Sequence, residues 1–457
     1  MAASSPLLSV RQMAAFAAPS ALLFLFRAAA YVIPALYAQR FQLDLADIAG
    51  ILFVMRTVEV LLQIPIGLVS DATRHARHGR KPLVMLGVAL GSVATWFVYV
   101  PPEGASLVYL AVWLSLATLA GSLTEVAYGA WATEITSDYR ERARCASYQT
   151  WASIAGKEMY ALVPLLWFLT SNRITFESLQ VTAWILAAVT PLVLLCAWRW
   201  APTGDTLVPI ERVSLRQMLD LVLRNGPLQR VLVVLILWEL GTGFMFGLDF
   251  MRIDSYLEAG EAVPLQSLFG VWAAMAGLAA LQWILKRHEK HHVWAVSMSC
   301  LAGVLLAQLV LAPGMPHLVP IIVGLWMLVA ATVAGSLVVP MSLVGDLADY
   351  EALRSGNRAA GPMVAITQMT LKLFGGGAAA GALWVVSLFG FKPGQDSYDA
   401  TAAFGIHFVG LAMPAMFIIA GAIVAWRYPI TSRRHRAIVR SLERRSRGPL
   451  DARPEGA

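Results

Sequence analysis

The stretch RTVEVLLQIPIGLVSDATRHARHGRKPLVMLG, from Arg56 to Gly87, decides the fold class of this chain. Its first part is an apolar run that contains two strongly polar residues, Glu59 and Gln63, and its second part is a basic loop. An ionic group near the middle of a membrane helix costs roughly 2.5–3.5 kcal/mol on insertion scales, so it usually faces a polar interior and often serves function. The stretch therefore indicates a membrane helix that borders a polar interior and ends at a basic surface loop.

Ionic side chains interrupt other apolar runs in the same way. They are Arg27, Glu125, Glu239 and Lys372. Charges of both signs thus lie on different segments, at a depth where a lone charge is costly. This pattern favours a solute pathway over a membrane anchor.

The composition of the whole chain indicates an integral membrane protein. Hydrophobic residues make up 58% of it and charged residues 14%, whereas an average soluble domain carries roughly 25% charged residues. The three cysteines lie in or beside apolar runs at no metal-like spacing, so we expect packing residues and no disulfide framework. The net charge of +7 comes from basic residues in alternate loops and the tail, which argues against a nucleic-acid partner. No cleavable signal peptide is evident, and the first apolar run is interpreted as a membrane helix.

Twelve apolar runs are long enough to predict membrane helices, because a bilayer core needs about 20 apolar residues per helix. They cover residues 13–37, 47–69, 83–100, 106–131, 148–170, 181–200, 231–250, 266–285, 293–311, 317–344, 361–388 and 403–426. We expect an all-α membrane protein with twelve transmembrane helices in two six-helix halves, as in the major facilitator fold. The solute site of such a transporter lies between the halves near the midplane.

Basic residues gather in every second loop, which sets the predicted topology. The basic loops cover residues 74–81, 140–144, 212–230, 286–290 and 354–358, and the tail from Arg427 is densely basic. Cytoplasmic loops carry an excess of Lys and Arg. We therefore expect both termini in the cytoplasm, for a protein of the bacterial inner membrane.

The longest connection divides the chain into two parts. We expect an N-terminal six-helix half at 1–200, a cytoplasmic linker at 201–230, a C-terminal half at 231–426 and a basic tail at 427–457. The tail begins as a basic amphipathic stretch, and we interpret it as a surface helix that touches anionic lipid.

The end of the second predicted helix carries a small residue and an acid on one face. Gly67 and Asp71 are four residues apart, and Gly67 permits close helix approach. Asp71 is placed to accept hydrogen bonds from basic loop residues, and Arg80 and Lys81 anchor the next helix at the interface. We expect this loop to latch the two halves together on the cytoplasmic side in one state.

This stretch resembles the glycoside–pentoside–hexuronide:cation symporter family of the major facilitator superfamily, which includes melibiose permease. The matching residues are Arg56, Glu59, Gln63, Gly67, Asp71, Thr73, Arg74, Gly79, Arg80 and Pro82, with Gln63 in place of an acid. A second stretch, YGAWATEITSDYRERARCASYQ, is similar through Glu134, Asp138, Arg140, Glu141, Arg142 and Tyr148. A third, GDLADYEALRSGNRAAGPMVAITQMTLKLFGG, is similar through Asp346, Asp349, Tyr350, Gly356, Arg358, Gly361 and Lys372. The resemblance spans nearly the whole chain.

The resemblance implies a site for the coupling cation at Glu59, Gln63, Ser122 and Lys372. A sodium ion prefers several oxygen ligands and compensating negative charge, but this set has one carboxylate and a repelling lysine. We therefore expect a proton, with sodium as the alternative. A Glu in a low-dielectric setting tends to hold its proton, and Lys372 is expected to pair with the deprotonated form.

The family's sugar ligands are only partly present. Its acid on helix 1 corresponds to Ser20, its acid on helix 4 to Glu125, its aromatic residue to Gly129 and its helix 5 Arg to Thr150. An ordinary neutral galactoside is therefore not expected. The residues expected to face the solute are Arg27, Glu125, Trp131, Thr150, Trp151, Glu239 and Gln368.

Arg27 is the sharpest local clue, because the family pattern has no cation there. Its planar guanidinium suits a carboxylate, sulfonate or phosphate, which indicates an anionic solute. The alternative is a structural ion pair with Glu239 or Glu59.

The remaining motif residues are interpreted as gate and architecture residues. They are Arg56, Gly67, Asp71, Arg80, Lys81, Glu134, Asp138, Arg142, Asp346, Asp349 and Arg358. The histidines at 75, 78, 288, 291 and 292 lie in basic loops without an acid cage, so we expect no metal site. We find no nucleophile–base pair and no phosphate-binding glycine loop, and we expect neither an enzyme nor a cofactor.

We expect a secondary active transporter that couples a cation, preferably a proton, to a small polar solute by alternating access. The solute is expected to be sugar-like or an organic acid, with an anionic one in view because of Arg27. One alternative is a transporter of a lysolipid-like or amphipathic substrate. Another is a non-transporting assembly or sensor protein on the same fold. The expected partners are the solute, the cation and the lipid bilayer, and we expect a monomer.

Overall fold

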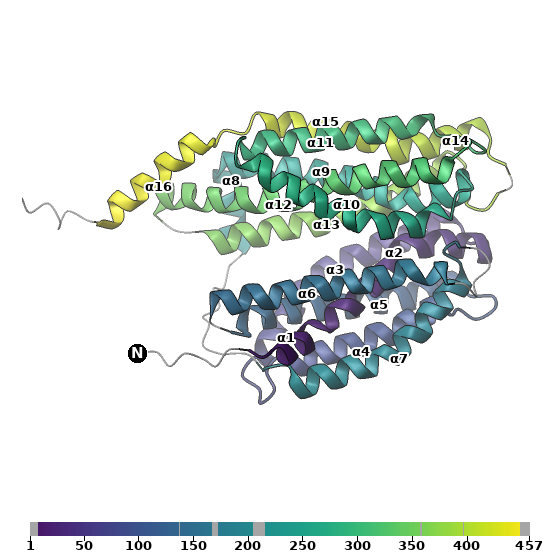
Figure 1. Ribbon diagram of the computed structural model, residues 1–457, viewed down its shortest axis with the longest axis horizontal. Coiled ribbons are helices and arrows are strands. Elements are labelled where there is room, and N and C mark those ends of the chain that lie inside the picture. Colours follow the sequence, from purple (N-terminus) through teal and green to yellow (C-terminus); the bar gives the residue numbers. More distant parts are fainter. Residues whose placement is uncertain are drawn as a thin grey trace, which may run out of the picture.

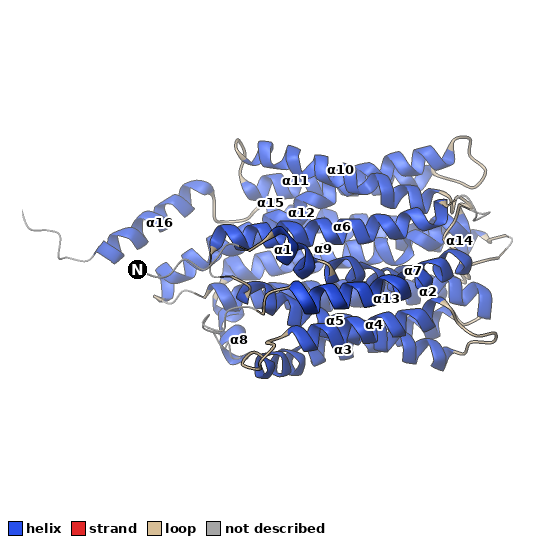
Figure 2. Cartoon of the chain, turned by 60° about the horizontal axis from the view of Figure 1, so that its bottom comes forward, coloured by secondary structure: helices blue, strands red, loops and turns tan. Residues whose placement is uncertain are grey.

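The computed structural model describes residues 8–136, 138–166, 172–203, 215–356, 359–395 and 397–447. Within the helices, the side chains of residues 27–30, 139–140, 215–216, 334, 337, 360 and 445–447 lie outside the described set. The described chain consists of helices and loops, and it contains no strand (Figure 2). The all-α prediction is confirmed.

The α-helices follow one another with short connections. They are α1 (Val10–Ala17), α2 (Pro19–Phe41), α3 (Leu45–Thr73), α4 (Lys81–Tyr99), α5 (Leu107–Glu134), α6 (Tyr139–Leu162), α7 (Phe176–Trp200), α8 (Leu215–Arg224), α9 (Gly226–Met251), α10 (Ala262–Leu285), α11 (Lys290–Ala307), α12 (Leu318–Ser355), α13 (Ala360–Leu388), α14 (Ala400–His407), α15 (Met413–Trp426) and α16 (Ser432–Arg447). Short 3-10 or π turns are η1 (Val163–Leu165), η2 (Arg252–Tyr256), η3 (Gln308–Val310) and η4 (Phe408–Ala412).

Ten helical segments of the described chain are long and apolar enough to cross a membrane. The helices α3 and α6 are also long, with 29 and 24 residues, but they lie outside this set of ten. Both contain intramembrane or interfacial charge, which lowers their hydropathy. The protein is therefore a multi-pass membrane protein, and the count of twelve spans stays a prediction.

Two helix boundaries differ from the predicted ones for the same reason. The helix α12 continues to Ser355, eleven residues past the predicted end at 344, and α6 begins at Tyr139 instead of residue 148. Apolar length detects only the part of a helix that crosses the bilayer. Capping residues set the limits of these charged extensions. Asp138 caps the start of α6 with its side chain, and Gly356 ends α12 with φ of 79°.

Figure 1 shows α1–α7 on one side of the molecule and α8–α16 on the other. We call these the N-terminal group and the C-terminal group. The start of α1 and the helix α16 lie at the same end of the bundle, which we call the terminal end. The helix α13 packs against α9 within its own group and against α3 across the groups.

Glycines let α13 and α9 approach each other closely. A Cβ atom at Gly243 would lie 2.5 Å from the Cβ of Ala378, and one at Gly247 would lie 2.9 Å from the carbonyl oxygen of Ala379. Small residues at membrane helix interfaces allow such backbone approach. This contact fixes the face of α13 that is turned toward the N-terminal group.

Candidate functional site

A buried ionic cluster lies halfway along α3. Glu59 is only 8% exposed, and its carboxylate accepts a hydrogen bond of 2.5 Å from the Ser122 hydroxyl of α5. Its other oxygen accepts one of 2.7 Å from the guanidinium of Arg56, one turn earlier on α3. The structure therefore brings Glu59 and Ser122 together as the sequence resemblance implies, and it adds Arg56 as the counter-charge.

A second ion pair joins the two helix groups. The Lys372 ammonium of α13 lies 3.0 Å from a carboxylate oxygen of Glu125 on α5. The two side chains are 26% and 36% exposed, so this pair is more open than the Glu59 cluster. The sequence resemblance led us to expect a pair between Lys372 and Glu59. In the structure Lys372 pairs with Glu125, and Arg56 pairs with Glu59.

Two glycines of α13 give room to charged side chains from both groups. A Cβ atom at Gly375 would lie 2.2 Å from a carboxylate oxygen of Glu239 on α9. A Cβ atom at Gly376 would lie 2.8 Å from the Cδ of Arg56. Glu239 and Arg56 therefore approach α13 at successive positions, one turn past Lys372. Ionic groups from α3, α5, α9 and α13 meet at about one level of the bundle.

Gln63 lies one turn after Glu59 on α3, and its buried side-chain Nε2 has no hydrogen-bond partner within the described part of the chain. A buried amide donor without a partner is costly. The Gln63 amide is therefore available to a group that enters beside Glu59. Its side chain supplies no negative charge, which leaves Glu59 as the acid on this turn of α3.

The predicted solute residues are only partly brought together. Glu125 and Glu239 lie in the central cluster, whereas the side chain of Arg27 lies outside the described residues, so both readings of Arg27 stay predictions. Thr150 donates to the carbonyl of Ala146 on its own helix. Two further solute candidates, Trp151 and Gln368, are exposed on α6 and α13.

Trp131 is a packed residue near the end of α5. Its side chain is fully buried, its indole N–H donates to the carbonyl of Pro202, and its ring packs edge-on against Phe16 at 5.0 Å. Its contact with the solute stays a prediction. Ser20 is likewise buried and pairs with the hydroxyl of Tyr128 at 3.0 Å.

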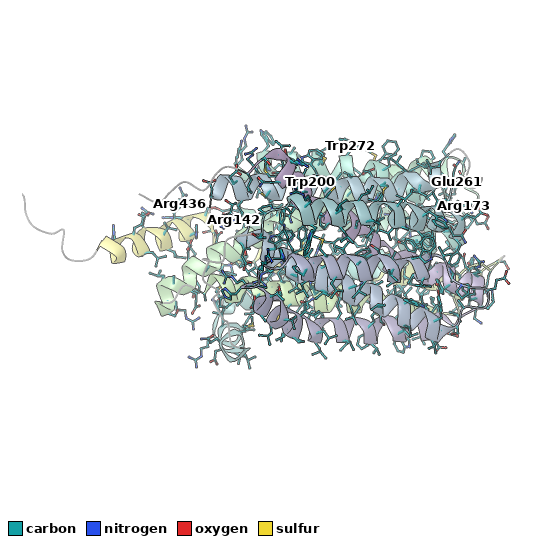
Figure 3. The ribbon with its side chains drawn as sticks, turned by 90° about the horizontal axis from the view of Figure 1, so that it is seen from below. Arg142, Arg173, Trp200, Glu261, Trp272 and Arg436 are labelled. Carbon is teal, nitrogen blue, oxygen red and sulfur yellow. The ribbon has the colours of Figure 1, made fainter. Side chains whose placement is uncertain are left out.

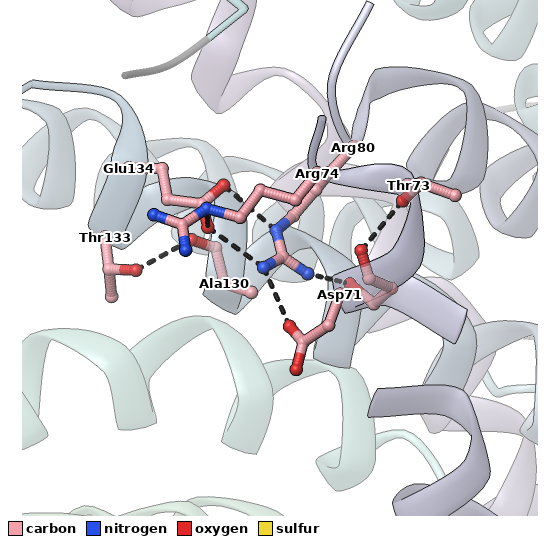
Figure 4. A network of polar contacts seen from close by, with 8 residues as sticks. Asp71, Thr73, Arg74, Arg80, Ala130, Thr133 and Glu134 are labelled. Carbon is pink, nitrogen blue, oxygen red and sulfur yellow. Dashed lines mark hydrogen bonds and ion pairs between the residues drawn. The ribbon is translucent and has the colours of Figure 1, made fainter. Parts of the chain in front are cut away.

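A buried charge network closes the terminal end of the N-terminal group (Figure 4). The Arg80 guanidinium donates two hydrogen bonds of 2.9 and 3.0 Å to Glu134 and one of 2.9 Å to Asp71. Arg74 also lies 3.1 Å from Glu134. Burial lowers the pKa of Arg80, but hydrogen bonds and charge attraction from Glu134 and Asp71 outweigh it, so that the pKa is raised.

This network differs from the predicted latch between the halves. Its residues all belong to α3, α4, α5 and the loop between α3 and α4, and therefore to one group. Gly67 has no atom within 4 Å of a hypothetical Cβ, so it makes no close helix contact here. Lys81 donates to the carbonyl of Trp198 at 3.3 Å, Asp138 caps α6, and Arg142 donates to the carbonyl of Thr136.

The C-terminal group repeats this arrangement with other residues. The Lys290 ammonium at the start of α11 lies 2.8 Å from Asp346 near the end of α12. His435 of α16 lies 3.2 Å from Asp349, so the tail helix docks on the same region. Arg358, the remaining predicted gate residue, lies outside the described residues.

Polar contacts also join the groups at the end opposite the termini. The Gln39 amide of α2 donates to the hydroxyl of Ser255 at 2.9 Å, and Arg173 donates to the carbonyl of Glu258 at 2.8 Å. Figure 3 shows Arg173 beside Glu261 at this end, far from Arg436 of the tail. The two groups are therefore held together away from the terminal end.

Two charged residues of α6, Lys157 and Glu158, escaped sequence reasoning. Both carboxylate oxygens of Glu158 are buried, and neither has a hydrogen-bond partner among the side chains that the structure describes. The rule that singled out Glu59 also applies to them, because both lie inside the predicted run 148–170. Their position inside an apolar run is the sequence feature that indicates them.

Comparisons with known proteins give the family. A family model described as MFS/sugar transport protein matches residues 15–432. The chain is 23% identical to the putative glycoside/cation symporter YagG of Escherichia coli (strain K12), over 95% of each chain. It is 24% identical to the uncharacterized symporter YnaJ of Bacillus subtilis (strain 168), over 91% of this chain and 90% of that protein. It is 21% identical to the raffinose carrier protein of Pediococcus pentosaceus, over 88% of this chain and 65% of the carrier's length.

Solved structures give the fold. A bacterial homologue of the human lysosomal transporter Spinster, inward-facing and unoccupied, has a TM-score of 0.66 at 13% identity, over 94% of this chain and 97% of that one. A D-xylose–proton symporter has a TM-score of 0.62 at 12% identity, over 92% and 98%. At sequence identities this low, the likeness to solved structures supports the major facilitator fold and nothing about the solute. With the family match across most of its length, the chain belongs to the MFS/sugar transport protein family and is an integral, multi-pass membrane transporter and not an enzyme.

Proposed function

We propose that this protein is a cation-coupled symporter of a small, polar, sugar-like solute that works by alternating access. The names of its relatives, a raffinose carrier and a putative glycoside/cation symporter, support this class of cargo. The observation that carries the proposal is the ion pair between Lys372 and Glu125. It joins the two helix groups next to the buried Glu59, so a solute that enters between them competes for the bridge.

The moving bodies are the two halves at 1–200 and 231–426, joined by the linker at 201–230, with the tail at 427–457 attached to the second. The contacts from Gln39 to Ser255 and from Arg173 to Glu258 support a state that is closed at the end opposite the termini. The basic loops at the terminal end support a cytoplasmic location for both termini, in a bacterial inner membrane.

The coupling cation is a proton, and Glu59 carries it. Glu59 is buried, and its contacts among the described residues are one hydroxyl and one guanidinium, without a second carboxylate for a metal ion. Ser122 stabilises the ionised carboxylate through its O–H donor, and Arg56 neutralises it. A protonated Glu59 releases Arg56. The Gln63 amide, one turn from Glu59, can donate a hydrogen bond to a group that enters there.

This release gives the finer proposal that the solute carries a negative charge. Arg56 is 24% exposed beside its acid partner, so a carboxylate on the solute has access to it once Glu59 is neutral. The guanidinium fork binds carboxylates in a two-point geometry. Proton and anion binding would then favour each other, because each removes the other's competitor.

A solute screen tests the proposal. Thermal unfolding of the purified protein is measured with raffinose, xylose, a hexuronide and a lysophospholipid, because a bound ligand raises apparent stability. Hits are then tested for counterflow in proteoliposomes. We expect stabilisation by a sugar or hexuronide, more strongly at low pH, and counterflow of the same compound.

A matched pair of variants makes the screen specific. Arg56→Gln is expected to lose the preference for a hexuronide, and Arg433→Gln, on the exposed face of the tail helix, is expected to keep it. Lysophospholipid flux without sugar flux would favour the amphipathic-substrate alternative. Stabilisation and counterflow by none of the compounds would favour the non-transporting alternative.

A further inference from the structure

A largely apolar groove of about 570 Å³ opens on the outer surface of the C-terminal group. Its walls are the terminal-end half of α10 and the first part of α11, and its floor is α12. Small side chains dominate the lining, which includes Gly277, Ala280, Val296, Cys300, Ala331 and Gly335. Val296 is 50% exposed and Cys300 is exposed, so the groove faces the surroundings of the helix bundle.

The groove is a built feature of the packing. A Cβ atom at Gly277 would lie 2.4 Å from the carbonyl oxygen of Ala331, so α10 touches α12 there. A Cβ atom at Gly335 would lie 2.8 Å from the hydroxyl of Ser297, which donates to the carbonyl of Thr332. Both walls are thus tied to the floor, and the space between them stays open.

The end of the groove near the terminal end is basic and aromatic. His288, His292 and Trp426 line it, and the rings of His292 and Trp426 lie 4.4 Å apart. The adjoining loop exposes Lys286 and Arg287, and the Arg287 guanidinium lies 4.5 Å over the ring of Trp283.

The acidic residue of this loop, Glu289, is bound by the start of the tail helix. Glu289 accepts hydrogen bonds from the backbone N–H and the hydroxyl of Ser432, at 2.9 and 2.8 Å. Burial raises the pKa of Glu289, but these two bonds and the nearby histidines outweigh it and lower the pKa. Lys290 is likewise engaged by Asp346. Lys286 and Arg287 are the loop cations left to meet a ligand at the groove's mouth.

We propose that this groove binds one anionic glycerophospholipid from the leaflet at the terminal end, with an acyl chain between α10 and α11 and its phosphate at Lys286 and Arg287. An apolar groove at this depth is filled by hydrocarbon, and basic pockets beside membrane helices attract anionic head groups. Aromatic residues such as Trp283 and Trp426 prefer the head-group level. The positive charge of Lys286 and Arg287 favours an anionic lipid, and the small lining residues leave space for the acyl chain.

The N-terminal group supplies a contrast. A groove of about 480 Å³ between α3 and α5 is lined by Gly50, Val54, Met55 and Ser115, but its charged lining residue is the acid Asp47. It has a similar size and the opposite charge. It is therefore expected to accept lipid chains without preference for an anionic head group.

Cys300 provides the probe, because it lies inside the basic groove. The protein with Cys145→Ser and Cys196→Ser is purified in detergent, and alkylation of Cys300 by a maleimide is timed with added dioleoylphosphatidylglycerol or dioleoylphosphatidylcholine. At a phosphatidylglycerol concentration about ten times Kd, one-site occupancy predicts alkylation about tenfold slower. The phosphatidylcholine curve is expected to need a several-fold higher concentration for the same protection.

Two further variants decide whether the site is specific. Lys286→Gln with Arg287→Gln is expected to remove the difference between the two lipids while chain-dependent protection stays. In the control groove, Ser115→Cys with Cys300→Ser is expected to show equal protection by both lipids. Equal protection at Cys300 by both lipids, or the same phosphatidylglycerol preference at Ser115→Cys, would overturn the proposal. Protection that rises with protein concentration without lipid would also overturn it, because a second copy would then cover the groove.

Discussion

At the scale of single residues, the most informative side chain is Glu59. It is buried, and its two oxygens contact donors of different kinds, the Ser122 hydroxyl and the Arg56 guanidinium. The contact with Ser122 could be predicted, because the motif on α3 is distinctive enough to align the acid with its partner helix. The contact between Lys372 and Glu125 could not, since it depends on the tilt and rotation of α13 against α5. Glycines at 375 and 376, whose neighbours are invisible in the sequence, help to set that rotation.

Removal of the Ser122 hydroxyl should shift the pH dependence of transport. Ser122 donates a hydrogen bond to the Glu59 carboxylate, so Ser122→Ala removes one of the two contacts of the proposed coupling residue. We expect the pH midpoint of solute counterflow to change in Ser122→Ala, and Ser115→Ala on the same helix to leave it in place. An unchanged midpoint in Ser122→Ala would separate Glu59 from the coupling step.

The ion pair between Lys372 and Glu125 should show energetic coupling. In a double-mutant cycle with Lys372→Ala and Glu125→Ala, we expect the two effects on thermal unfolding to be non-additive by about 1 kcal/mol, because both side chains are partly exposed. Saturating solute should remove the coupling if the solute competes for the pair. Additive effects without solute would show that the two side chains do not interact in the membrane.

At the scale of elements, close packing of α13 on α9 positions the site. The length of the apolar runs predicted both helices well, but it missed the charged ends of α6 and α12. The packing of Trp131 could not be predicted either. A tryptophan near a predicted site is indistinguishable in sequence from one that packs under a helix end, and here the indole N–H donates to the carbonyl of Pro202.

A methyl group at Gly243 should push α9 away from α13. The added Cβ would meet the Cβ of Ala378 at 2.5 Å and the carbonyl oxygen of Gly375 at 2.8 Å. We expect Gly243→Ala to lower the free energy of unfolding by about 1–3 kcal/mol, as overpacking does. Gly121→Ala on α5 has open space and should be neutral or stabilising by up to about 1 kcal/mol. Equal effects of the two in a thermal unfolding assay would contradict the close packing.

The buried network around Arg80 should matter more for stability than an exposed charge. Glu134→Gln removes the charge that neutralises Arg80, which is 2% exposed, and should cost about 3 kcal/mol. Arg433→Gln changes an exposed residue of the tail helix and should cost less than about 0.5 kcal/mol. The measurement is chemical unfolding in detergent, and a reversed order would refute the structural role of the network.

At the scale of the whole molecule, the charges on α3, α5, α9 and α13 converge where the two helix groups meet, and polar contacts close the end opposite the termini. Apolar runs and their basic loops foretold the membrane class, and motif spacing foretold the family. The depth in the bundle at which the ionic groups meet could not be predicted. It depends on how glycines of one helix pack against side chains of other helices. The proposed alternating-access mechanism rests on this shared polar centre between the two groups.

The most direct test of the account is uphill uptake into proteoliposomes under an imposed pH gradient, with the solute that the thermal screen selects. The account predicts that acid-driven accumulation occurs without sodium, that Glu59→Gln abolishes it but keeps counterflow, and that Glu103→Gln, in an exposed loop, retains both. Accumulation by Glu59→Gln, or uptake that follows a sodium gradient and ignores pH, would contradict it.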